Sequence, residues 1–216
     1  MRSILIIGLG RFGKHLALKL MELGNEVMIV DKDEDVVNKL ASQVTRALVG
    51  DCMEEGVLES LGVSNFDLCF VCISDDFQSS LEITSILKEL GAPCVISKTD
   101  RDIHAKFLLK IGADHVIYPE RDMAQRAAFK YSAKNAFDYI ELTPEYAIFE
   151  AEVPEKWIGK TLRELDIRSK HNINVIGRKT GEKVIPFTSP DYVFSAGEHL
   201  VFAGGKMDIM GLMDKN

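Results

Sequence analysis

Residues 3–13 read SILIIGLGRFG, and this stretch decides the fold. An apolar run leads into a G-x-G-x-x-G turn, and the amphipathic stretch KHLALKLMEL follows it. Gly8 permits the tight turn, Gly10 lets the backbone approach a phosphate, and Gly13 lets the next helix pack closely on the strand. The N-terminus of that helix offers N–H groups and the positive end of its dipole to an anion. The segment therefore predicts a phosphate-binding strand–turn–helix unit.

Strand and helix signals alternate through residues 1–120. The strand candidates are continuous apolar runs, of the kind that a parallel sheet buries on both faces: SILIIG, EVMIVD, TRALVGD, DLCFVCIS, CVISKT and HVIYP. Glycines stand between helix and strand where a left-handed residue can end a helix, at Gly24, Gly62, Gly91 and Gly112. We predict an α/β fold for this region, a Rossmann-like doubly wound parallel sheet with strand order 3-2-1-4-5-6.

The alternation stops after Pro119. The stretch from Arg121 to Phe137 predicts one long helix, so we assign residues 121–138 to a helix and linker. Residues 139–216 then predict a smaller α+β domain. Its elements are the β-like stretch YIELTPEYAIFEAEVPE, a short helix in KTLRELDI, strands in NINVIGRK, EKVIP and EHLVFAGG, and a closing helix in KMDIMGLM.

The composition narrows the class of protein. A net charge of −7 with no basic run argues against nucleic-acid binding. No apolar run approaches the length of about 20 residues that a membrane span needs, and no signal-peptide pattern is seen, so we expect a cytoplasmic chain. The cysteines suit a reducing compartment. Cys69 and Cys72 form a C-x-x-C, but residues three apart on a strand point to opposite faces, which argues against a shared metal.

Polar residues end several predicted strands at one edge of the sheet, where open α/β sheets bind ligands. Asp31, at the end of the second strand, can accept hydrogen bonds from ribose hydroxyls. Asp51 and Cys52 should border an adenine, whereas Lys98 is equally consistent with a solvated side chain and with a ligand contact. The predicted binding set is Gly8, Gly10, Arg11, Phe12, Gly13, Asp31, Lys32, Asp51, Cys52, Ile73, Ser74, Lys98 and Glu120.

Arg11 departs from the usual dinucleotide-binding turn, in which a small or apolar side chain stands at this position. A guanidinium one residue after Gly10 can bind two oxygens of a phosphate, most usefully a terminal one. The alternative is a solvent-facing arginine in the first helical turn. A cation at a helix N-terminus is electrostatically unfavourable, which favours a functional reason for its presence.

The sequence carries no recognisable catalytic apparatus. Tyr131 is followed by Asn135 at the fourth position, so the Tyr-x-x-x-Lys pair of short-chain dehydrogenases is missing. No histidine is spaced from a carboxylate as in a catalytic dyad, and no nucleophile elbow, Walker lysine motif or zinc-ligand cluster occurs. We therefore expect a protein that is not an enzyme.

Several segments together carry a family resemblance. GLGRFG, VDKDE, GDCMEEGVLESLGV, SDD, ISKTD and IGADHVIYPERDMAQRAA resemble the regulatory RCK (KTN) domain of potassium transporters and channels. WIGKTLRELDIRSKHNINVIGRK and SPDYVFSAGEHLVFAG resemble the TrkA-C (RCK-C) domain. The resemblance covers essentially the whole chain and is greatest to the cytosolic gating subunits of Ktr-type potassium uptake systems.

This resemblance implies a nucleotide-sensing regulatory subunit that binds ATP or ADP, with NAD(H) in relatives, at the glycine turn. It implies dimers formed through the helix from Arg121 to Phe137, an octameric ring of these dimers, and a membrane-embedded potassium-translocating partner at the cytoplasmic face of the membrane. Arg11 would sense the γ-phosphate of ATP, partly across the dimer interface. Glu120 matches the glutamate of the family's P-E-K/R-D-M segment, which holds Mg²⁺ or Na⁺.

The resemblance also implies a second ligand, cyclic di-AMP, in the C-terminal domain at the dimer interface. Arg168 would meet phosphate, Asn174 an adenine edge, and Val175 with Pro190 would supply apolar contact; ordinary turn and strand residues are the alternative. Two residues depart from the family pattern. Lys32 next to Asp31 weakens the preference for an unphosphorylated ribose, and Cys52 replaces a more usual alanine or asparagine.

Two other functions stay open at this point. The first is a small NAD(H)-dependent oxidoreductase or NADH-responsive redox sensor, which would need a pocket for a hydride acceptor. The second is a free-standing signalling module that binds only cyclic di-AMP and has a degenerate N-terminal site.

Overall fold

The computed structural model describes residues 1–54, 56–132, 136–143 and 145–213. The chain divides into two compact units, residues 1–121 and 122–216. Part of the segment that the sequence assigns to a helix and linker, residues 133–135, lies outside the described residues. Each unit is built around its own sheet and has its own core.

The first unit alternates strands and helices. Its elements are β1 (Ser3–Ile7), α1 (Arg11–Glu22), β2 (Glu26–Asp31), α2 (Glu34–Leu40), η1 (Ala41–Gln43), β3 (Arg46–Val49), α3 (Val57–Ser60), η2 (Val63–Asn65), β4 (Leu68–Val71), α4 (Phe77–Glu89), β5 (Val95–Lys98), α5 (Asp102–Lys110), β6 (His115–Ile117) and the start of α6 (Pro119–Ser132). The strands form one parallel sheet with the order β3-β2-β1-β4-β5-β6, which confirms the predicted Rossmann-like topology.

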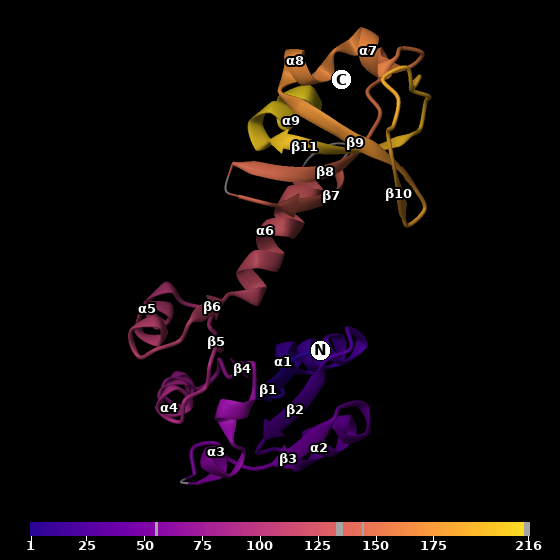
Figure 1. Ribbon diagram of the computed structural model, residues 1–216. Helices are drawn as coiled ribbons and strands as arrows, with labels where there is room; N and C mark the ends of the chain where they lie inside the picture. Colours follow the sequence, from indigo (N-terminus) through magenta and orange to yellow (C-terminus); the bar gives the residue numbers. More distant parts are fainter. Residues whose placement is uncertain (55, 133–135, 144, 214–216) are drawn as a thin grey trace. The chain divides into compact units, whose positions relative to one another are not determined.

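Helices cover both faces of this sheet, with α1 and α2 on one side and α4 and α5 on the other (Figure 1). Alternate residues of β1 therefore enter different cores: Ile4 and Ile6 pack with α1 and α2, whereas Leu5 and Ile7 pack with α3 and α4. Burying side chains of this size stabilises the fold by about 1.5–3 kcal/mol each. Burial on both faces explains why the strands are continuous apolar runs.

The C-x-x-C follows the same two-faced rule. Cys69 belongs to the core beneath α4, and Cys72 belongs to the core beneath α1 and α2. The two thiols thus point to opposite faces, as the sequence predicted. Within the ranges that the structure describes, no group of three or more histidine, cysteine, aspartate or glutamate residues is placed to hold a metal ion.

The glycine turn joins β1 to α1 by close backbone packing. Gly8 has a φ of +91°, a conformation that favours glycine. A Cβ on Gly13 would lie 2.1 Å from the carbonyl oxygen of Gly8, so no larger residue fits there. Gly13 and Ala17, four residues apart, are buried on the side of α1 that faces the sheet. Small residues at both positions let the helix approach the strand.

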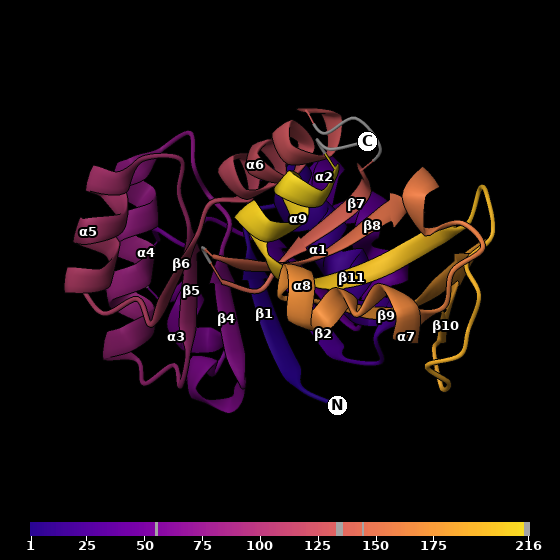
Figure 2. The same ribbon diagram turned by 90° about the horizontal axis from the view of Figure 1, so that it is seen from above.

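The second unit is an antiparallel sheet with short helices. Its elements are the rest of α6, then β7 (Ala136–Glu141), β8 (Tyr146–Glu152), η3 (Glu155–Trp157), α7 (Leu162–Leu165), α8 (Ile167–His171), β9 (Ile173–Thr180), β10 (Lys183–Pro186), β11 (His199–Gly205) and α9 (Lys206–Met213). The strand order is β10-β9-β11-β8-β7, and Figure 2 shows β8, β11 and β9 side by side. The predicted smaller α+β domain is confirmed.

One face of this sheet carries an aromatic core. Phe149 of β8 and Phe202 of β11 are almost fully buried with Trp157 and Phe194, and the Trp157 and Phe194 rings lie 5.7 Å apart. Ile209 of α9 packs into the same cluster. Large aromatic side chains supply much of the buried area that a small unit needs.

The helix predicted from Arg121 to Phe137 is wrong at both ends. It begins at Pro119, because proline is favoured at the first helical position, where its missing N–H has no helical partner to lose. Its described part extends to Ser132, residues 133–135 lie outside the described residues, and Phe137 belongs to β7. Strand pairing of β7 with β8 overrides the local helical pattern there.

Replacing Gly13 by alanine should destabilise the first unit. The added Cβ must displace the Gly8 carbonyl or the helix, and overpacking of this kind lowers the free energy of unfolding by about 1–3 kcal/mol. Urea unfolding of the variant measures the loss. Gly10→Ala is the matched control, because a Cβ there meets nothing within 4 Å and Gly10 has a φ of −60°. Equal stability of the two variants would contradict the proposed packing constraint.

Candidate functional site

A cavity of about 400 Å³ lies at the carboxyl ends of the strands in the first unit. Its lining contains every residue of the predicted binding set except Gly13, which packs behind the turn instead. The predicted residues that line it are Gly8, Gly10, Arg11, Phe12, Asp31, Lys32, Asp51, Cys52, Ile73, Ser74, Lys98 and Glu120. The cavity thus brings together residues that are up to 113 positions apart in the chain, from Ile7 to Glu120.

The sequence analysis missed part of the lining. Gly50, Met53, Asp75, Asp76 and Ser79 also border the cavity. Asp76 is the N-cap of α4, where its side chain accepts hydrogen bonds from the backbone N–H and the hydroxyl of Ser79. The pattern Asp-x-x-Ser before a helix is a local signal that could have found this edge of the cavity.

Asp31 holds the glycine turn in place. One carboxylate oxygen accepts the backbone N–H of Leu9, inside the turn, and the other accepts the N–H of Asp33. The carboxylate therefore connects the end of β2 to the turn after β1. A carboxylate oxygen can accept more than one hydrogen bond, so Asp31 can still accept one from a ribose hydroxyl.

The N-terminus of α1 opens on the cavity. The N-cap is Gly10, which has no side chain to accept hydrogen bonds from the first N–H groups of the helix. Arg11, the first helical residue, is exposed and lines the cavity beside them. This end of the cavity therefore offers backbone donors and a guanidinium, the groups that bind phosphate.

A second cation, Lys98, lines the same cavity. Lys98, the last residue of β5, is only 8% exposed. Its Nζ donates to Glu120 Oε1 at 2.8 Å and to Ser74 Oγ at 3.2 Å. The contact with the Lys98 ammonium holds the pKa of Glu120 below its usual range, with a smaller effect of Arg11. Lys98 is thus a buried, ion-paired residue and not a solvated one.

Glu120 is the one predicted metal ligand. Mg²⁺ is commonly held by one or two carboxylates together with substrate phosphates and water. Glu120 fits that arrangement as a single carboxylate whose side chain is 62% exposed at the cavity, but Lys98 already occupies one of its oxygens. A cation there would draw its other ligands from bound phosphates and water, and the residue that would hold it on the protein is Glu120.

Two buried thiols line the cavity, Cys52 and Cys72. Burial raises the pKa of Cys52 to about 12, and the charges of Asp51 and Asp31 act in the same direction. Burial likewise raises the pKa values of Cys69 and Cys72 to about 12. Cys94 is partly exposed, and its pKa is raised less, again by burial.

A second, shallower hollow lies in the second unit and has a volume of about 410 Å³. It is lined by all four residues that the resemblance assigned to cyclic di-AMP: Arg168, Asn174, Val175 and Pro190. Arg168 and Asn174 are exposed, on α8 and β9, and Phe187 and Ile173 form part of the apolar wall.

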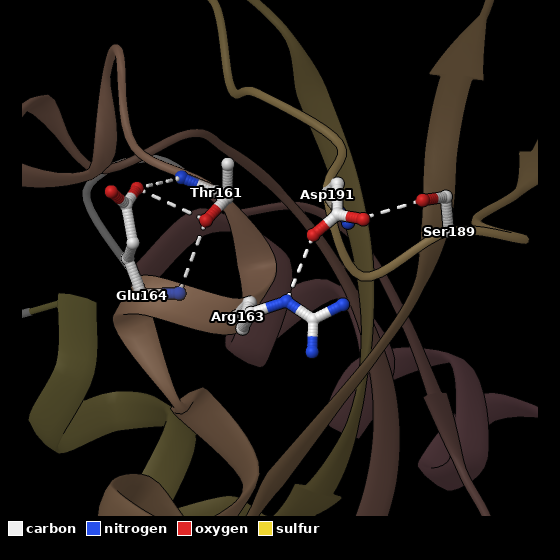
Figure 3. Close-up of polar contacts among 5 residues, drawn as sticks. All are labelled: Thr161, Arg163, Glu164, Ser189 and Asp191. Carbon is white, nitrogen blue, oxygen red and sulfur yellow. Dashed lines mark hydrogen bonds and ion pairs between the residues drawn. The ribbon is translucent and has the colours of Figure 1, made fainter.

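Two hydrogen bonds from Arg163 hold the rim of this hollow, and Figure 3 shows the one to Asp191. The Arg163 N–H donates to the carbonyl of Pro190 at 2.9 Å, and Arg163 Nε donates to Asp191 Oδ1 at 2.8 Å. Thr161 and Glu164 form a capping box that fixes the start of α7, the helix that carries Arg163. The Pro190 loop is therefore anchored to α7.

One charged group in the second unit was not foreseen. Glu150 is 8% exposed and accepts hydrogen bonds from Lys179 Nζ and His199 Nδ1, the latter at 3.0 Å. These hydrogen bonds lower the pKa of Glu150 despite its burial, which acts in the opposite direction. The three residues come from β8, β9 and β11, so their meeting depends on strand register and leaves no spacing signal in the sequence.

The fold and the cavity define a class: a Rossmann-like unit whose glycine turn and first helix N-terminus border a cavity, followed by a small antiparallel domain. The TrkA-N domain model matches residues 4–119, and the TrkA-C domain model matches residues 147–215. The chain belongs to the family of TrkA-N and TrkA-C domain proteins that includes the Ktr system potassium uptake proteins. The resemblance seen in the sequence is confirmed.

Relatives match over nearly their whole length. Ktr system potassium uptake protein C of Bacillus subtilis (strain 168) is 42% identical, covering 96% of this chain and 94% of its own. Ktr system potassium uptake protein A of the same organism is 36% identical with the same coverage. Ktr system potassium uptake protein A of Vibrio alginolyticus is 33% identical over 94% of this chain and 92% of its own.

Solved structures share the fold. The GsuK RCK domain superposes with a TM-score of 0.66 at 22% identity, covering 99% of this chain and 47% of that one. The GsuK channel bound to NAD gives a TM-score of 0.67 at 21% identity, covering 96% of this chain and 38% of that one. This chain therefore spans less than half the length of either structure. No helix within the described ranges is long and apolar enough to cross a membrane.

Alkylation of the folded protein should modify one thiol per chain. At roughly pH 8, a thiol with a pKa near 12 is ionised in about one molecule in ten thousand, so Cys52, Cys69 and Cys72 should resist iodoacetamide. Cys94 should react first, because it is partly exposed. Mass spectrometry of the native and the urea-unfolded chain measures this. Rapid labelling of Cys52 in the native chain would contradict the burial and raised pKa of this thiol.

Proposed function

We propose that this chain is the nucleotide-sensing regulatory subunit of a potassium uptake transporter and not an enzyme. One observation carries the proposal: a cavity at the glycine turn, with the open N-terminus of α1, Arg11 and Lys98 around it. Membership of the family that includes the Ktr system potassium uptake proteins supports the transport role. The partner is a membrane-embedded potassium-translocating subunit, and this chain binds it from the cytoplasmic face as a ring of homodimers, an octamer.

The ligand that we propose for the cavity is ATP or ADP, with NAD(H) as the related alternative. Cations and helix N–H groups at one end suit the phosphates, and Asp31 with Asp51 at the β2 and β3 ends suits ribose and adenine. Two solved structures, the GsuK channel bound to NAD and GsuK bound to ADP, support a nucleotide in this fold. The latter superposes with a TM-score of 0.54 at 19% identity.

Such a subunit works as a switch only if ATP and ADP bind its conformations with different affinities. The two nucleotides differ in the terminal phosphate, so the difference must arise where that phosphate lies. Arg11 is placed at the open N-terminus of α1 and can add a bidentate contact to a terminal phosphate. We assign it the role of distinguishing the two nucleotides, in cis or across a dimer interface.

Replacing Arg11 by alanine should reduce the ratio of ATP affinity to ADP affinity by about tenfold, since a charge-assisted hydrogen bond contributes about 1.5–3 kcal/mol. Isothermal titration calorimetry with both nucleotides measures the ratio, and adenosine affinity should not change. Arg46→Ala is the matched control, because Arg46 is exposed on β3 and does not line the cavity. An unchanged ratio in the Arg11 variant, or a normal transport response to ATP, would show that Arg11 does not read the terminal phosphate.

For the second unit we propose cyclic di-AMP as the ligand. The hollow at Arg168 supports this, because it joins an exposed guanidinium and an amide to an apolar wall, as a phosphate and a base require. The anchored loop at Pro190 gives the wall a defined shape. Binding there would inactivate the transporter from a site separate from the nucleotide cavity.

Arg168→Ala should weaken cyclic di-AMP binding by about tenfold through loss of a charge-assisted phosphate contact, and it should leave ATP affinity unchanged. Calorimetry of both ligands on the full chain measures this. Lys183→Ala, an exposed cation on β10 outside the hollow, is the control. If wild-type protein binds no cyclic di-AMP, or if Lys183→Ala weakens it equally, the assignment of this hollow is wrong.

A further inference from the structure

The Lys98–Glu120 ion pair is strongly asymmetric. The Lys98 side chain is 9% exposed, whereas the Glu120 side chain is 62% exposed. A buried ammonium requires a counter-charge, because an unpaired buried charge is strongly destabilising. An exposed carboxylate has no such requirement, since water solvates it. The pair can therefore be broken at little penalty to Glu120, provided that another anion pairs with Lys98.

The cavity is the place where another anion can arrive. Lys98, Ser74 and Glu120 all line it, and Arg11 lies near enough to Glu120 to lower the pKa of that carboxyl. The ammonium has three donors, and Ser74 and Glu120 take two of them within the described part of the chain. A phosphate can accept the third hydrogen bond first and then compete with the carboxylate for the whole charge.

The carboxylate that is released would also stay stable. Glu120 is the second residue of α6, and a negative charge at a helix N-terminus is favourable. Its own backbone N–H already contributes to lowering its pKa. Glu120 can therefore be accommodated both when it is paired with Lys98 and when it is solvated at the start of α6.

We propose that Lys98 is an exchangeable counter-ion of the nucleotide cavity: it pairs with Glu120 in the empty site and transfers to the phosphates of a bound nucleotide, which frees Glu120. This deepens, and rests on, the proposed nucleotide binding. Glu120 is thus a competitor of the phosphates for Lys98 until they bind. Only afterwards is its carboxylate available to a cation, so cation binding at Glu120 depends on a phosphate being present.

The test measures the affinity of the full chain for adenosine, ADP and ATP by calorimetry, with EDTA present throughout. Lys98→Met should weaken ATP binding by about tenfold or more and change adenosine binding less than about twofold, because only phosphates use the ammonium. Glu120→Gln should strengthen ATP binding by up to about fivefold. The variant lacks the carboxylate that competes with the phosphates for Lys98, and an ion pair with one exposed partner contributes about as much as a surface salt bridge. If the ion pair had only a structural role, the two substitutions would not change ATP affinity in opposite directions.

Lys88→Met is the matched control. Lys88 forms a salt bridge of 3.0 Å with Asp114 in the same unit, and neither residue lines the cavity. The Lys88→Met variant should bind adenosine, ADP and ATP with the affinities of the wild type. Thermal unfolding checks that each variant is folded, and the Glu120→Gln measurement stands alone if Lys98→Met does not fold.

The outcomes separate the two proposals. If the wild type binds no ATP, both the proposed function and this inference fail. If ATP binds but Glu120→Gln leaves its affinity in EDTA unchanged or lower, Glu120 does not compete for Lys98 and only this inference fails. A third outcome is that Glu120→Gln lowers ATP affinity in excess Mg²⁺ but leaves it unchanged in EDTA. Glu120 would then act solely as a cation ligand, and this inference would fail.

Discussion

The first unit depends on a contact that leaves no room for a side chain, between Gly13 of α1 and the carbonyl of Gly8. This contact fixes how closely α1 lies on β1, and hence where the helix N-terminus opens. The same turn presents the Leu9 N–H to Asp31, which connects it to β2. Helix position, cavity shape and the placement of Arg11 therefore follow from one backbone approach that only glycine permits.

Most of the first unit could be predicted because local and global signals agree there. Buried parallel strands are apolar throughout, so their order of appearance and the polar residue that ends each one were visible in the sequence. Asp31, Ser74 and Lys98 thus lie at the same edge of the sheet, as the strand ends predicted. The pairing of Lys98 with Glu120 was not visible, because the two residues lie 22 positions apart and meet only through the way that β5 and α6 approach the cavity.

The second unit shows why register limits such predictions. Glu150 meets His199 only because β8 and β11 pair with Val201 opposite Glu150, and a shift of one residue would turn these side chains to the other face. A bulge between Val201 and Phe202 also shifts the pairing with β9. The end of α6 was missed for a similar reason. Residues 136–141 join β7 through pairing with β8, a long-range interaction that no local helical pattern reveals.

A sensor and an enzyme place different demands on charged groups. An enzyme gains from charges fixed in advance around the reacting atoms. A switch needs a group with two arrangements of similar free energy, which a ligand can bias. Under the proposed exchange Lys98 is such a group, since it is buried, needs a counter-charge, and has an exposed partner that water can solvate once an anion takes its place. That partner belongs to the first turn of α6, and the same helix continues past Asp122 into the second unit's segment of the chain. The proposed change in the partner of Lys98 would therefore take place at the first turn of the helix whose sequence runs from the first unit into the second.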